Sequence, residues 1–280
     1  MIVSVIIPFY YGNDYICGLL EILNNNYKEL EFFKEANMEV IIVNDSPNEE
    51  VKYNKNDYEV PIIVLQNEKN CGIHKTRNHG LDNCNGDYVL FLDQDDIISD
   101  YYIYSQLSKI GDADFIVSNG YIKNECGEIE IYQNTIHQEK SVDINSSFYY
   151  SNMIVSPGQV LIKSSSIPKE WKDYCFVNNG ADDHYLWILM LLNGKKAKIN
   201  RDKIYTHMYT GNNASLNKQN MLKSNLELVE RLEGKVDKKL LNALKRRVIY
   251  YGKNESIIRK VLYFDVVFKR HVYKKSLHLN

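Results

Sequence analysis

Short apolar runs alternate with amphipathic stretches along the first two thirds of the chain. The runs are rich in Val, Ile and Leu and have the length of buried strands, at residues 1–8, 39–46, 61–66, 86–92 and 159–162. The stretches place their apolar residues at helical spacing, at residues 13–27, 74–84, 100–110 and 182–192. This alternation predicts an α/β fold in which helices flank both faces of a mostly parallel central sheet.

Weaker signals complete the pattern. Residues 121–123 and 130–132 predict a hairpin, and residues 197–199 and 204–207 predict two further strand pieces. From about Lys218 to the end the pattern is helical.

Charge divides the chain at about the same place. Residues 217–280 contain 16 Lys and Arg against 6 Asp and Glu, although the whole chain has a formal net charge of −2. We therefore expect a catalytic or binding domain at residues 1–215 and a basic helical C-terminal extension at residues 216–280.

The most informative motif is a set of acids at the end of one apolar run. Asp93, Asp95 and Asp96, with Gln94 among them, follow the run directly. The carboxyl ends of strands form the edge at which open α/β sheets bind ligands. Crowded carboxylates repel one another, so a divalent cation such as Mn²⁺ or Mg²⁺ is a natural partner. A polar turn after a buried strand is the alternative interpretation of this motif alone.

A second acidic pair opens the predicted helix at residues 182–192. Asp182 and Asp183 precede a strongly apolar stretch, where acids can cap a helix and interact with its dipole. Taken alone, such a pair at a helix start is explained by capping.

Composition narrows the class of protein. Apolar content of 44% and charged content of 25% are typical of soluble globular proteins. The formal net charge says little by itself, and we expect no nucleic-acid partner. The five cysteines lack zinc-ligand spacing, and no window approaches the ~20 apolar residues of a membrane helix. The first apolar run lacks the basic flank of a signal peptide, so we expect a cytoplasmic protein. The residues after this run also lack the glycine fingerprint of a dinucleotide-binding fold.

Four segments taken together carry a family resemblance. They are a first strand ending in Pro8 and an aromatic, a second strand ending in Asp45-Ser46, a loop from Asn70-Cys71-Gly72 to Arg77-Asn78, and the acidic motif from Asp93. In this order and at these separations they resemble family 2 glycosyltransferases of the GT-A fold, across roughly residues 1–210.

The resemblance implies an inverting glycosyltransferase. Such an enzyme moves a sugar from a nucleotide-diphospho-sugar, here expected to be UDP-linked, to a hydroxyl group of a glycan or lipid-linked acceptor in cell-surface polysaccharide or glycolipid synthesis. Asp183 would be the general base, and Asp182 would hold the helix start or contact the acceptor. The family more often has glutamate first in this pair. A catalytically silent nucleotide-sugar or glycan-binding module is the alternative.

The resemblance also implies binding roles. Asp45 would bond the uracil ring and Arg77 would lie near the base and phosphates, although a turn aspartate and a surface cation are the plainer interpretations. The expected nucleotide-sugar site comprises Pro8, Tyr10, Asp45, Gly72, Arg77, Asp93 and Gln94. The expected metal ligands are Asp93, Asp95, Asp96 and His207. For His207, membership of a polar network is the alternative.

The end of the chain combines apolar and basic residues. Apolar and aromatic residues recur near helical spacing at 257, 258, 261, 264, 267 and 268, with basic residues between and after them. This mixture is typical of an interfacial helix on anionic lipid, which would place the protein on the inner face of the cell membrane. The alternative is a helix that packs its apolar stripe on the catalytic domain and leaves its lysines solvated.

Overall fold

The computed structural model describes residues 1–34, 36–211, 213–252 and 257–279. Within these residues, nine strands form one sheet in the order β3-β2-β1-β4-β8-β6-β9-β5, and β7 pairs with β6. The strands are β1 Ile2–Phe9, β2 Asn37–Asn44, β3 Ile62–Gln66, β4 Tyr88–Phe91, β5 Ile97–Ile98, β6 Phe115–Asn124, β7 Gly127–Glu130, β8 Val160–Lys163 and β9 Ala197–Met208.

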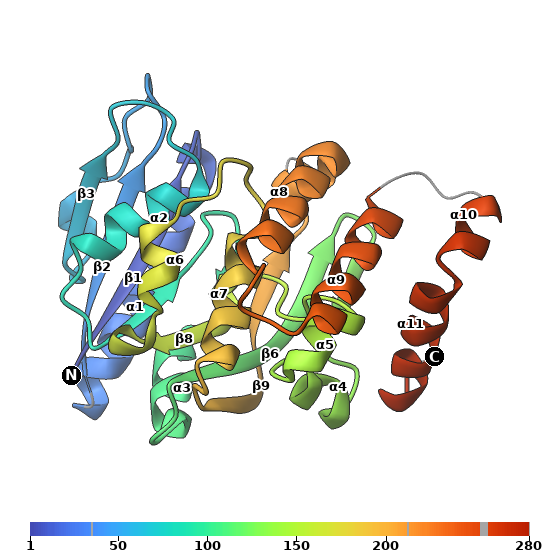
Figure 1. Cartoon of the computed structure of the whole chain (residues 1–280). Coiled ribbons are helices and arrows are strands. Elements are labelled where there is room, and N and C mark those ends of the chain that lie inside the picture. The colour runs from blue at the N-terminus through green and yellow to red at the C-terminus, as the bar shows by residue number, and fades with distance from the viewer. Residues whose placement is uncertain (35, 212, 253–256, 280) are drawn as a thin grey trace.

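Helices cover both faces of this sheet (Figure 1). The α-helices are α1 Asn13–Phe33, α2 Ile73–Asp82, α3 Tyr102–Ile110, α4 Thr135–Lys140, α5 Ile144–Tyr149, α6 Lys169–Asp173, α7 Asp182–Leu192, α8 Lys218–Arg231, α9 Lys238–Tyr251, α10 Ile257–Leu262 and α11 Phe264–Ser276. Single 3₁₀ turns occur at Lys55–Asp57, Pro157–Gln159, Ser164–Ser166 and Ala214–Leu216.

The predicted α/β class is confirmed, and the sheet is mixed. β1 pairs in parallel with β2 and β4, and β2 pairs in parallel with β3. In the other half β6 and β9 are parallel, but β8 runs antiparallel to both β4 and β6, and β5 and β7 are antiparallel to their partners. The expected parallel arrangement therefore holds for β1 to β4, where helical crossovers keep strands parallel.

The predicted elements differ from the observed ones mainly at their ends. The helix expected at 182–192 is α7 with the same bounds, whereas the helix expected at 13–27 continues to Phe33. The two strand pieces expected at 197–199 and 204–207 form one strand, β9, which shifts its register against β6 near Asn119. The sequence did not predict α4, α5 and α6, because helices of five or six residues are too short to show a period.

One glycine sets the distance between α2 and the sheet. A Cβ atom at Gly80 would approach Cγ2 of Ile6, on β1, to 2.4 Å and Cγ2 of Val43, on β2, to 3.1 Å. The interior is close-packed, so a larger residue would displace the helix or the strand. The close approach fixes α2, and with it Arg77, over the carboxyl ends of β1 and β2.

The helix α8 braces the segment that leads into α7. The hydroxyl of Ser224 accepts a hydrogen bond from the backbone N–H of Ala181 and donates one to the carbonyl oxygen of Asn178. Glu227, one turn later, accepts hydrogen bonds from the backbone N–H of Val177 and the hydroxyl of Tyr174. The domain boundary at residue 215 stays a prediction, and α8 is in direct contact with the segment before α7.

Candidate active site

A cavity of about 330 Å³ opens at the carboxyl ends of β1, β2 and β4. This is the edge at which open α/β sheets bind ligands. The residues that line it come from several loops: Pro8, Phe9, Tyr10, Asp45, Asn70, Gly72, Ile73, Thr76, Arg77, Asp93, Gln94, Asp95, Val155, Ser156, Pro157, Asn179, Gly180, Asp182, Asp183, His207, Asn213 and Ser215. Every predicted site residue except Asp96 borders this cavity.

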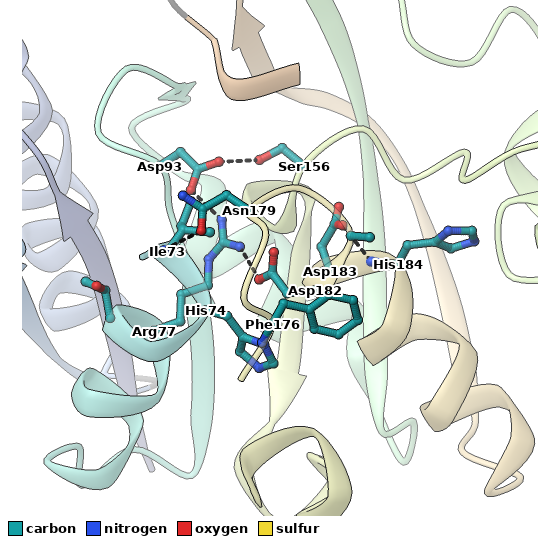
Figure 2. Close-up of polar contacts among 12 residues, drawn as sticks. Ile73, His74, Arg77, Asp93, Ser156, Phe176, Asn179, Asp182, Asp183 and His184 are labelled. Carbon is teal, nitrogen blue, oxygen red and sulfur yellow. Dashed lines mark hydrogen bonds and ion pairs between the residues drawn. The ribbon is translucent and has the colours of Figure 1, made fainter. Parts of the chain in front are cut away.

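A buried guanidinium lies at the centre of the site. Nη1 of Arg77 is 2.7 Å from Oδ2 of Asp182, and its Nη2 is 2.6 Å from Oδ1 of Asp93 (Figure 2). Arg77 is 3% exposed, so the interpretation as a surface cation is wrong. Burial opposes its charge, but the surrounding carboxylates raise the pKa of Arg77 overall, so it remains protonated. The two ion pairs connect α2, the loop after β4 and the start of α7.

The two acids at the start of α7 have different surroundings. Asp182 is 2% exposed, and its Oδ2 is held by Arg77 at the start of α7. Its expected contact with the acceptor stays a prediction, because Asp182 also borders the cavity. Asp183 is partly exposed to the cavity. Its Oδ1 accepts a hydrogen bond from the backbone N–H of His184 at 2.6 Å, and its Oδ2 accepts one from Nδ2 of Asn152 at 3.3 Å.

This difference changes the acidity of Asp183. Burial and the adjacent carboxylate of Asp182 raise the pKa of Asp183 to about 7, against the opposing effect of Arg77. A carboxylate with a pKa near neutrality can accept and release a proton at physiological pH. This acidity favours the expected role of Asp183 as the general base, which stays a prediction.

The acids of the Asp93 motif also separate into different roles. Asp96 is 2% exposed, and both of its oxygens are engaged within the protein. Its Oδ1 accepts from the backbone N–H of Met208 at 3.1 Å and lies 2.8 Å from Nδ1 of His207. Its Oδ2 accepts from the hydroxyls of Tyr205 and Ser156. Asp96 thus anchors β9 behind the cavity and is absent from its lining, and its expected role as a metal ligand stays a prediction.

Asp95 has the surroundings expected of a cation ligand. It borders the cavity, and burial together with the charges of Asp96 and Asp93 raises its pKa to about 6. A bound cation would offset this repulsion. In the described part of the chain, no three His, Cys, Asp or Glu side chains converge closely enough to hold a metal unaided. Magnesium, however, commonly needs only one or two carboxylates together with substrate phosphates. Asp95 and Asp93 therefore fit such a cation.

His207 lies on the cavity wall beside this motif. Burial lowers the pKa of His207, but the hydrogen bond to Asp96 and the negative charge of Asp96 outweigh this effect and raise it overall. Its Nδ1 is directed to Asp96, so the polar-network interpretation describes the structure directly.

Asp45 organises the glycine loop before α2. Its Oδ1 accepts from the backbone N–H of Cys71 at 2.7 Å, and its Oδ2 accepts from the backbone N–H of Gly72 at 3.0 Å. Gly72 has a φ of 84°, and a Cβ atom there would approach Oδ1 of Asn179 to 2.8 Å. Asp45 still borders the cavity, so its expected contact with a uracil ring stays a prediction.

The mouth of the cavity is shaped by a reciprocal pair of hydrogen bonds. The backbone N–H of Tyr10 donates to Oε1 of Gln94 at 2.8 Å, and Nε2 of Gln94 donates to the carbonyl oxygen of Tyr10 at 3.0 Å. The ring of Tyr10 remains 48% exposed next to Pro8. An exposed aromatic ring at this edge can stack on a planar base.

Sequence reasoning missed several residues of the site. Asn179 accepts a hydrogen bond from the backbone N–H of Ile73 at 3.2 Å and joins the start of α2 to the loop before α7. Ser156 donates to both Asp93 and Asp96. These contacts join segments that are about 60 or more residues apart in the sequence, and no local pattern indicates such pairs.

Comparison with known proteins identifies the family of the chain. Residues 4–170 match the family model for glycosyl transferase family 2. The match spans more than half of the chain and contains most of β1, Arg77 and the Asp93 motif. The chain therefore belongs to glycosyl transferase family 2, and the resemblance inferred from the sequence is confirmed.

Individual relatives match over shorter regions. Glycosyltransferase GlyA of Streptococcus pneumoniae is 33% identical over 129 residues, which is 44% of this chain and 17% of GlyA. A teichoic acid poly(glycerol phosphate) polymerase of Staphylococcus epidermidis is 27% identical over 41% of this chain and 16% of its own length. The matched regions thus cover about a sixth of these curated relatives.

Solved structures share the fold. The crystal structure of S. aureus TarS 1-349 in complex with UDP-GlcNAc superimposes with a TM-score of 0.64 at 18% identity, covering 90% of this chain and 72% of that chain. At this identity the likeness establishes the fold alone, which is the expected GT-A-like α/β fold.

The two acids of α7 should affect stability in opposite directions. Asp182→Asn removes a charge partner of the buried Arg77, so the free energy of unfolding should fall by about 3 kcal/mol. Asp183→Asn removes a carboxylate whose ionisation the fold opposes, so the free energy of unfolding should rise by roughly 1–4 kcal/mol above pH 7.

The sign follows from the raised pKa. The fold penalises ionised Asp183, and this penalty is absent below the unfolded pKa of about 4 and complete above the folded pKa of about 7. The gain from Asp183→Asn should therefore shrink as the pH falls from about 7 to about 4. Urea titrations of both variants across this pH range measure the change in the free energy of unfolding. Equal effects of the two substitutions would contradict the different surroundings that we assign to Asp182 and Asp183.

Proposed function

We propose that this protein is an inverting glycosyltransferase that moves a sugar from a UDP-sugar to a hydroxyl acceptor. The observation that carries the proposal is the placement of Asp183 and the Asp93 motif on one cavity, with Arg77 between them. TarS, which shares the fold, has been solved with UDP and with UDP-GlcNAc, and this supports a uridine nucleotide as the donor.

The proposed reaction is a single displacement. Asp183 removes the proton of the acceptor hydroxyl as its oxygen attacks the anomeric carbon. The bond between that carbon and the diphosphate breaks, and its electron pair leaves with UDP. Attack and departure take place on opposite sides of the carbon, so the anomeric configuration inverts and no covalent enzyme intermediate is needed.

The other residues of the site prepare this displacement. Arg77 fixes Asp182, and thus the start of α7, relative to the loop that carries Asp93. The ring of Tyr10 and the loop held by Asp45 are available to hold the uridine. Pro8, Gly72 and Gln94 shape the same part of the wall.

A divalent cation fits the acidic side of the cavity. Asp95 and Asp93 would hold it, with His207 close by, and Mg²⁺ or Mn²⁺ suits such oxygen ligands. When bound there, the cation neutralises negative charge on the leaving diphosphate. Asp96 would contribute indirectly, because it fixes His207 and the end of β9.

The acceptor can be assigned only by its chemical class. The relative named as a teichoic acid poly(glycerol phosphate) polymerase supports a role in the synthesis of a cell-surface polymer. We therefore propose a hydroxyl group of a glycan or a lipid-linked precursor as the acceptor. We also keep the expectation from the sequence that the protein acts in the cytoplasm.

Asp183→Asn should abolish transfer and preserve donor binding. Asparagine keeps the size of the side chain but cannot accept the acceptor's proton, and loss of a general base commonly costs ~10²–10⁴-fold in rate. The measurement is turnover of a panel of nucleotide sugars with Mn²⁺, alongside calorimetric donor affinity. Asp173→Asn, an exposed acid on α6, is the matched control and should behave as the wild type.

Two outcomes would change this assignment. Near-normal transfer by Asp183→Asn with none by Asp182→Asn would exchange the two roles. Donor binding by the wild-type protein without transfer or hydrolysis of any sugar in the panel would favour a silent binding module.

UDP affinity should depend on a divalent cation. Asp95→Asn removes a carboxylate that we assign to the cation. In Mn²⁺ this variant should therefore bind UDP more weakly than the wild type does, whereas in chelator the two proteins should bind UDP equally. Asp100→Asn, an exposed acid four residues beyond Asp96, should leave both affinities unchanged. Calorimetry provides the comparison, and identical wild-type affinity in Mn²⁺ and chelator would remove the metal from the proposal.

A further inference from the structure

The last long helix has apolar side chains on two opposite faces. One face packs on the rest of the protein: Val266 is 5% exposed, and Leu277, just past the helix end, is fully buried. On the same face Tyr273 stacks on Tyr149 and Tyr150, with ring centroids 6.4 and 6.0 Å apart. These packed residues lie outside the apolar stripe that the sequence indicated, whose members Phe264 and Phe268 are exposed. The helix therefore packs on the rest of the protein, but through a different face from the expected one.

The second face is unexplained by that packing. Phe264, Phe268 and Val272 follow one another at intervals of four residues, so they lie on one side of α11. They are 66%, 54% and 46% exposed, and the rings of Phe264 and Phe268 stack with centroids 5.9 Å apart. By helical geometry this side is opposite the one that carries Val266 and Tyr273.

The preceding helix also exposes apolar side chains. On α10, Ile258, Val261 and Leu262 are 74%, 72% and 66% exposed. We call Ile258, Val261, Leu262, Phe264, Phe268 and Val272 the outer apolar face. The sequence pattern also included Ile257, but the structure describes only the backbone of this residue. Clustered exposure of this kind marks an interaction surface more often than scattered single residues do.

The outer apolar face is held in place by contacts on its inner side. Arg246, on α9, donates to both carboxylate oxygens of Asp265, at 3.2 and 2.6 Å, and to the carbonyl oxygen of Leu262 at 2.9 Å. The guanidinium of Arg270 lies 4.9 Å from the ring of Tyr251. Figure 1 shows α10 and α11 at the edge of the molecule farthest from β3, where a large flat partner can reach them.

The charge around this face identifies its occupant. Residues 257–280 contain six Lys and Arg against one Asp. Lys274 and Lys275 are exposed, and Lys275 is three helical turns from Phe264, on the same side. A second copy of the chain would bring like charge against like charge, whereas a bilayer with anionic headgroups offers apolar depth and opposite charge together.

We propose that the outer apolar face docks this protein on an anionic lipid bilayer, with Phe264 and Phe268 inserted at the headgroup boundary. Among the described residues, no helix is both long and apolar enough to cross a membrane. The docking therefore takes place at the surface, and it does not depend on the transfer reaction.

Vesicle co-sedimentation tests the proposal. The intact chain should bind vesicles that contain phosphatidylglycerol at low salt, bind less at high salt, and not bind phosphatidylcholine alone. The double variant Phe264→Ser with Phe268→Ser should weaken partition by roughly tenfold or more. Phe32→Ser is the matched control, because Phe32 on α1 is 78% exposed but lies outside the face.

A second pair of variants tests the charge. Lys274→Glu with Lys275→Glu should lower binding, whereas Lys52→Glu with Lys55→Glu, an equal charge change elsewhere, should lower it far less. All substituted side chains are exposed, so circular dichroism should show native folding. If the double phenylalanine variant does not fold, Phe268→Ser alone and the lysine pair provide the test.

Three results would overturn the proposal. They are no binding of the wild-type chain to anionic vesicles at low salt, unchanged binding of the phenylalanine variant, and a wild-type dimer in ultracentrifugation that this variant dissociates while vesicles are not bound. The last result would assign the face to a second copy of the chain.

Discussion

A guanidinium that is almost completely removed from water must be compensated by negative charge, and at Arg77 two carboxylates provide it. Asp93 comes from the loop after β4 and Asp182 from the start of α7, so the requirement of one buried charge fixes three segments together. The close packing of Gly80 against Ile6 sets the height of Arg77 over the sheet. The geometry of the whole cavity depends on the two ion pairs of Arg77.

The acids on the two sides of Arg77 differ in their surroundings. Asp182 is committed to Arg77, which leaves its neighbour Asp183 at the cavity with a raised pKa. On the other side of Arg77, Asp96 is committed to β9 and Asp95 remains at the cavity with a raised pKa. Each acidic pair thus supplies one structural and one chemically available carboxylate. Adjacent titratable groups with different environments are a common basis for assigning catalytic roles.

The sequence predicted what local pattern can encode. The strands β1 to β4, the bounds of α7 and the acids that border the cavity followed from apolar runs and from the ends of those runs. It could not predict that Asp96 turns inward, because its partners Tyr205 and Met208 are more than 100 residues away in the sequence. The antiparallel direction of β8 in the sheet is likewise set by tertiary contacts, so the sequence did not predict it. On α11 the apolar spacing was visible, but its division into a packed and an exposed face required the structure.

In the proposed displacement, the proton acceptor and the leaving diphosphate lie on opposite sides of one anomeric carbon. The anomeric configuration of the product tests this most directly. With an α-linked UDP-sugar that the enzyme turns over, nuclear magnetic resonance of the freshly formed glycoside should show the β anomer. An α-linked product would mean retention of configuration and would contradict both the single displacement and the role assigned to Asp183.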